Sequence, residues 1–129
     1  MRIKASYTYP DGPTLNGNIY SEEVLVAAFE EPAFKEMNEA KAIPVLGTTQ
    51  GPLIGFASAT LDGKKVELDV NIHDEVYAKL LQDIYDTTGI SLAGMCEKEP
   101  SGTLTTIKYR EALLTSYLAV HCSMEIVKE

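Results

Sequence analysis

A hairpin signal in the middle of the chain constrains the fold more than any other feature. The dipeptide Asp62-Gly63 separates two strand-like stretches, residues 53–61 and 64–72. Asp-Gly favours tight two-residue turns, whose twist matches that of paired antiparallel strands. In the second stretch apolar and polar residues alternate, the apolar ones being Val66, Leu68, Val70 and Ile72. The pattern predicts a hairpin with one face in the core and the other in water.

Weaker signals on both sides of the hairpin predict further strands and helices. Strands are expected at residues 2–9, 43–46, 90–97, 103–109 and 113–120. One helix is expected to begin at the cap Ser21 and to end near Pro32, and a short second one to cover residues 33–40. A third is expected to follow Asp74 and to run to residue 85. This order predicts an α+β fold dominated by antiparallel sheet.

The apolar positions of these elements predict which side chains form the core. They are Phe29, Val45, Phe56, Val66, Leu68, Val70, Leu80, Leu81, Ile84, Ile90, Leu92, Leu114, Leu118 and Val120.

Length and charge limit the classes of function. A chain of 129 residues suits a single domain, and its net charge of −8 argues against direct binding to nucleic acid. No apolar run reaches the length of a membrane span, and the N-terminus lacks a signal-peptide core. The cysteines, Cys96 and Cys122, form no disulfide framework, so we expect an intracellular protein with free thiols.

Few residues are candidates for catalysis or metal binding. His73 is expected at a strand-to-helix junction, where an imidazole commonly caps, packs or faces solvent. His121 and Cys122 are adjacent near the end of an expected strand, where neighbouring side chains point to opposite faces and do not easily share a metal. The sequence contains no phosphate loop, dinucleotide fingerprint or metalloprotease motif. We therefore expect neither a metal nor a cofactor.

The order of several short motifs resembles that of a known family. In chain order they are Leu-Asn-Gly-Asn-Ile-Tyr at 15–20, Glu-Val-Leu at 23–25, Ile-Pro-Val-Leu at 43–46, Gly-Pro-Leu-Ile-Gly at 51–55, Gly-Ile-Ser-Leu-Ala-Gly at 89–94 and the stretch 113–120. Taken together they resemble the prohead, or capsid maturation, proteases of tailed phages. The resemblance covers roughly residues 2–120.

The resemblance carries expectations about fold and site. It implies the small antiparallel β-barrel with two or three flanking helices that phage and herpesvirus maturation proteases share. It also implies that Ser91 is the candidate nucleophile. Family members carry a catalytic histidine just after the strand that residues 43–46 resemble, whereas residues 47–51 here contain none. Because a serine needs a base to take its proton, activity would require another histidine, with His121 as the candidate and His73 as a second.

The missing histidine favours a protein that binds without catalysis. We expect a single protease-like domain over 1–129 that serves as a phage head protein, either a decoration or cement protein or a core component. Its expected partners are the major capsid protein or other head proteins, and a homo-oligomer is also compatible. Residues 123–129 are expected to form a terminal arm that contacts a neighbour. The expected location is the virion, after assembly in the host cytoplasm.

Two alternatives stay open. One is an active prohead serine protease that cleaves scaffold and capsid termini with Ser91. The other is an accessory binding domain that shares the barrel topology but does not associate with heads.

Overall fold

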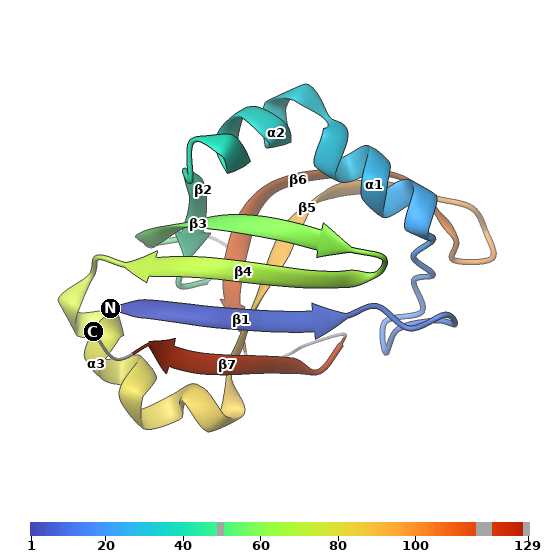
Figure 1. Ribbon diagram of the computed structural model, residues 1–129. Coiled ribbons are helices and arrows are strands. Elements are labelled where there is room, and N and C mark those ends of the chain that lie inside the picture. The colour runs from blue at the N-terminus through green and yellow to red at the C-terminus, as the bar shows by residue number, and fades with distance from the viewer. Residues whose placement is uncertain (49–50, 116–119, 128–129) are drawn as a thin grey trace.

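One curled sheet dominates the computed structural model, which describes residues 1–48, 51–115 and 120–127, the side chain of Tyr85 excepted. The strands run in the order β5-β6-β2-β3-β4-β1-β7 and form a half-barrel (Figure 1). Their bounds are β1 (Arg2–Thr8), β2 (Ile43–Leu46), β3 (Leu53–Asp62), β4 (Lys65–Ile72), β5 (Gly89–Lys98), β6 (Leu104–Thr115) and β7 (Cys122–Val127). The helices within the described residues are α1 (Glu22–Glu30), α2 (Pro32–Glu39), α3 (Glu75–Ile84) and the short 3-10 helix η1 (Tyr85–Thr87). The predicted α+β class is confirmed.

The central hairpin forms as predicted, with its turn one residue further along. Asp62 pairs with Lys65, so Gly63 and Lys64 are the turn residues. Gly63 has a φ of 61°. A left-handed residue at the first turn position is what a two-residue hairpin turn with glycine there requires. The four alternating apolar residues of β4 are all buried.

Strand β6 is longer than the sequence indicates. The expected strands at 103–109 and 113–120 are one strand, β6, as far as Thr115, while residues 116–119 lie outside the described part. The polar pair Arg110-Glu111 resembles a break between strands. In the structure Gly94 pairs with Tyr109 and Ala93 with Glu111, so Arg110 is an extra residue at a bulge.

Strand β7 changes the expectation for the end of the chain. Cys122–Val127 pairs antiparallel with β1, from Tyr7 opposite Cys122 to Arg2 opposite Val127. Most of the expected arm is therefore an edge strand of the sheet itself. The physical reason is its alternation: Cys122 is buried and Met124 and Ile126 are partly buried against the core.

Helices close the two ends of the half-barrel (Figure 1). At one end, α1 is capped by Ser21, whose hydroxyl accepts a hydrogen bond from the backbone N–H of Val24 at 3.1 Å. Phe34 of α2 is fully buried and packs against Tyr109 of β6. At the other end, Leu81 of α3 is fully buried.

Most of the predicted core residues are buried. Those that are buried are Val45, Val66, Leu68, Val70, Leu81, Ile90, Leu92 and Leu114. Phe29, Ile84 and Val120 are half-buried, and Leu118 lies outside the described residues. The prediction was wrong for Phe56 and Leu80, which are exposed. In β3 the inward positions are Ala57 and Ala59, which leaves Phe56 on the outer face.

Candidate functional site

Ser91 lies on the outer face of β5, between two inward-facing residues. Ile90 and Leu92 are buried in the core, whereas Ser91 is half-buried. Alternation along a strand therefore places the Ser91 hydroxyl on the outside of the half-barrel. Within the described residues this hydroxyl makes no hydrogen bond.

The neighbours of Ser91 across the sheet are leucines. Ser91 pairs with Leu113 of β6, Leu113 with Leu46 of β2, and Leu46 with Leu53 of β3. Leu46 and Leu113 are half-buried and Leu53 is 52% exposed. We call Leu53, Leu46 and Leu113 the leucine row, and Ser91 stands at its end. Side chains directly opposite one another on a sheet are the closest cross-strand neighbours, and leucine cannot accept a proton.

Glu111 is the titratable side chain beside the leucine row on β6. It pairs with Ala93 and is half-buried, one step diagonal from Ser91. Diagonal neighbours in a sheet lie about 7–8 Å apart, a distance that only long side chains span. No hydrogen bond joins Glu111 to Ser91 among the residues described.

Neither histidine is hydrogen-bonded to Ser91 within the described residues. His121 is exposed just before β7, next to Cys122, whose thiol donates to the carbonyl of Ile90 at 3.5 Å. His121 therefore directly precedes a residue that contacts β5, yet no hydrogen bond links it to Ser91 within the described part. His73 follows β4 and packs edge-on against Phe56, with ring centroids 5.6 Å apart. Strands β3, β2 and β6 separate β4 from β5 in the sheet. The described residues therefore contain no hydrogen bond between Ser91 and a histidine.

A tyrosine occupies the space just after β2. Gly47 directly follows β2, and a Cβ atom there would lie 2.6 Å from the ring of Tyr77 in α3. A side chain at position 47 would therefore have to displace this ring. No local sequence pattern indicates this contact, because Gly47 lies far before Tyr77 in the chain.

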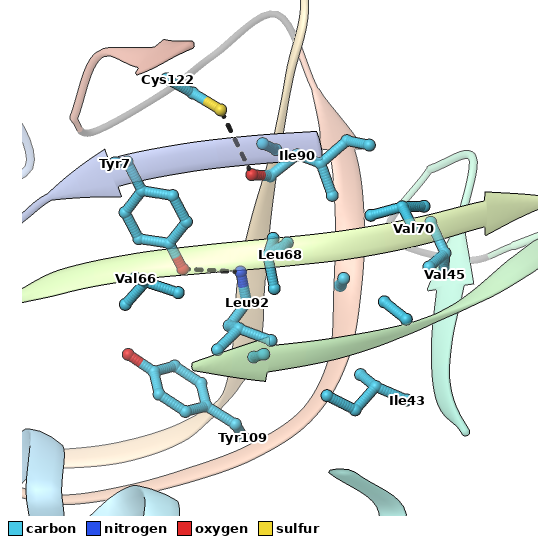
Figure 2. Packing of buried hydrophobic residues seen from close by; sticks show 14 of the residues in the cluster. Tyr7, Ile43, Val45, Val66, Leu68, Val70, Ile90, Leu92, Tyr109 and Cys122 are labelled. Carbon is cyan, nitrogen blue, oxygen red and sulfur yellow. Dashed lines mark hydrogen bonds between the residues drawn. The ribbon is translucent and has the colours of Figure 1, made fainter. Parts of the chain in front are cut away.

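Two side-chain hydrogen bonds bridge the open side of the half-barrel. The backbone N–H of Leu92 donates to the Tyr7 hydroxyl at 3.0 Å, and the Cys122 thiol reaches the carbonyl of Ile90 (Figure 2). Burial raises the pKa of the Cys122 thiol, so it stays protonated and is a poor nucleophile. These contacts connect the edge strand β5 to β1 and β7, and they have a structural role.

Buried tyrosines line the interior beside this opening. The hydroxyl oxygens of Tyr9 and Tyr109 lie 2.8 Å apart in a hydrogen bond. The Tyr9 ring also stacks on Tyr20 at a centroid distance of 3.9 Å. Burial raises the pKa of Tyr7, Tyr9 and Tyr109 well above the usual value, so these hydroxyls remain neutral hydrogen-bonding groups.

The described residues offer no evident metal site. Among them, no group of three His, Cys, Asp or Glu side chains is placed to hold a metal ion. No helix in this part of the chain has the length and apolar character that crossing a membrane requires.

Comparison with known proteins identifies no relative. No protein-family model matches the chain, and neither a curated protein nor a solved structure matches it. The resemblance to prohead proteases therefore stays a prediction from the motifs.

Proposed function

We propose that this chain is a non-catalytic phage head protein, a decoration, cement or core component that binds the major capsid protein or another head protein. The observation that carries the proposal is the pairing of Ser91 with Leu113 and, beyond it, Leu46. A serine nucleophile needs a base within hydrogen-bond reach, and a leucine fills the position directly across from Ser91 on β6. A protease-like domain without its base is suited to binding.

The leucine row supplies the surface for that binding. Its three side chains lie side by side across β3, β2 and β6, and Leu53 is 52% exposed. Contiguous apolar side chains on the outside of a protein are typical of interaction sites. Val76 of α3, 73% exposed, adds a further apolar side chain near the start of β3, where the backbone N–H of Asp74 donates to the Ile54 carbonyl at 3.2 Å.

The experiment compares two exposed leucines. Leu53→Ser removes an apolar side chain from the row, whereas Leu15→Ser changes one that is 90% exposed and lies outside it. Quantitative mass spectrometry of purified heads, from the phage that encodes the chain, gives the number of copies per head. We expect many copies of the unchanged protein and of Leu15→Ser, and few of Leu53→Ser. Mature heads that hold few or no copies of the unchanged protein would contradict a structural role and favour an accessory domain.

The protease alternative is tested separately. The purified chain is incubated with scaffold and capsid proteins, and their termini are analysed by mass spectrometry. The proposal expects intact termini. Cleavage that disappears in Ser91→Ala would establish the protease instead.

A further inference from the structure

A cavity lies on the outer face of the sheet, away from the leucine row. Its volume is about 650 Å³, and it lies over β3, β4 and the start of β1, beside the connection between α2 and β2. The lining residues that matter here are Arg2, Lys41, Phe56, Asp69, Asn71 and His73. We call it the Lys41 cavity. Its size falls within the range of small-molecule sites.

The charges around the cavity leave one cation in excess. The Arg2 guanidinium donates two hydrogen bonds to Asp69, from Nε at 2.9 Å and from Nη2 at 2.7 Å, so these charges offset each other. The hydrogen bond from Arg2 is also the main reason why the pKa of Asp69 is lowered, with smaller contributions from the charges of Lys4 and Lys41. Lys41 makes no ion pair within the described residues.

Lys41 adopts a left-handed backbone conformation just after α2. Lys41 has a φ of 56°, and its N–H donates to the Asn38 carbonyl while that of Ala42 donates to Met37. This pair of bonds is the usual C-terminal helix motif, in which glycine is preferred at the left-handed position. Lys41 therefore occupies a position that favours glycine.

Two exposed polar side chains and an aromatic ring complete the lining of the cavity. The register places Asn71 between Phe56 and Arg2, on the outer face. Within the described residues, neither the Asn71 amide nor the His73 imidazole makes a side-chain hydrogen bond. The Phe56 ring is 37% exposed and meets the His73 ring edge-on. The cavity thus presents hydrogen-bond donors next to an apolar wall.

We propose that the Lys41 cavity binds a carboxylate that carries an apolar group. The Lys41 ammonium and the Asn71 amide hold the carboxylate, and the apolar group rests against Phe56. A single excess charge beside Asp69 suits a monoanion better than a phosphate dianion. The carboxylate comes either from a free acid or from the C-terminus of a peptide, and both present the same chemistry. This proposal is independent of head binding through the leucine row.

The test compares ligands that differ only in charge. The probes are phenylacetate with phenylacetamide, and acetyl-Gly-Gly-Phe as the free acid with its C-terminal amide. NMR follows the Asn71 side-chain amide and the His73 ring during titration. We expect saturable shifts with each acid and binding of each amide that is weaker by about tenfold or more, because hydrogen bonds to charged groups are stronger. Tighter binding of the peptide acid than of phenylacetate identifies a peptide C-terminus as the source, and the reverse identifies a free acid. Equal shifts with the acid and its amide, or no saturable shift, would overturn the proposal.

A matched pair of variants excludes a general charge effect. Lys41→Gly removes the ammonium and places the preferred residue in the left-handed turn, so it should fold with an unchanged or higher melting temperature. Lys79→Ala removes the same charge from the exposed side of α3, outside the cavity. We expect Lys41→Gly to lose acid binding and Lys79→Ala to keep it. Equal losses in both variants, or full binding by Lys41→Gly, would contradict the proposal.

Discussion

The Tyr7 hydroxyl accepts a hydrogen bond from the backbone N–H of Leu92 at 3.0 Å and so joins β1 to the far edge of the sheet. Strands β1 and β5 are not paired with each other, and both groups of this bond are buried. One side chain therefore satisfies a backbone donor that would otherwise be orphaned on the open side of the half-barrel.

This contact predicts a large effect for a small change. Tyr7→Phe keeps the ring and removes the acceptor, which leaves the buried Leu92 N–H unsatisfied. We expect the free energy of unfolding to fall by about 1–3 kcal/mol. Tyr77→Phe is the control, since the Tyr77 hydroxyl makes no hydrogen bond with the described residues. Urea denaturation that finds the same stability for both variants would mean that the bond across the opening contributes nothing.

Alkaline pH should unfold the protein through its buried tyrosines. Burial raises the pKa of Tyr7, Tyr9 and Tyr109 well above 10, so the folded state holds protons that the unfolded state releases above that pH. Stability should therefore be intact below pH 10 and decline as the pH rises further. Ultraviolet absorbance of tyrosinate should show these three residues ionising together with the loss of far-ultraviolet circular dichroism. Ionisation of all tyrosines while the fold persists would contradict the burial of this cluster.

Low pH should weaken the link between the helices and β6. Arg110 donates to both carboxylate oxygens of Glu31, at 2.6 and 2.7 Å, and this hydrogen bonding lowers the pKa of Glu31. A lowered carboxyl pKa contributes stability above the unfolded value, near 4.5, that is lost as the pH falls through the folded value. Glu31→Gln should cost less than about 1 kcal/mol near neutral pH, because the pair is partly exposed. Thermal melts should show that this difference shrinks below pH 4.5. A constant difference down to pH 2 would assign it to packing.

Adjacent leucines in α3 test which helix face enters the core. Leu81 is fully buried and Leu80 is 44% exposed. Leu81→Ala should therefore destabilise the protein by about 2–5 kcal/mol, and Leu80→Ala by much less. Calorimetry of the two variants makes the comparison, with the same substitution one residue apart. Equal costs would show that the assigned face of α3 is wrong.

Local patterns in the sequence were sufficient for elements whose partners are near in the chain. The alternation of Val66, Leu68 and Val70 with polar residues determines which face of β4 is buried. A shift of one residue in the strand register would expose all three side chains. Ser21 marks the start of α1 through a hydrogen bond formed within one helical turn. Both features depend only on nearby residues.

Pairing between distant segments could not be predicted in the same way. The terminal segment becomes an edge strand only because β1 is available to pair with it. In β3, Gly55 lies so close to Asn71 of β4 that a Cβ atom at position 55 would be 1.9 Å from the Asn71 carbonyl oxygen. Neither this close approach nor the outward position of Phe56 is indicated by the local sequence. The same limit applies to the candidate site: the motif indicates Ser91, whereas its neighbours Leu113 and Leu46 follow from the register of three strands.

The reactivity of Ser91 tests most directly whether the site is catalytic. A fluorophosphonate modifies serines whose proton is removed by a neighbouring base, and mass spectrometry locates the modified residue. With leucines beside Ser91, the folded protein should show no labelling there beyond the level of the urea-unfolded chain. Rapid stoichiometric labelling of Ser91 that is lost in His121→Ala would show an activated serine, and it would contradict the account of a non-catalytic binding protein.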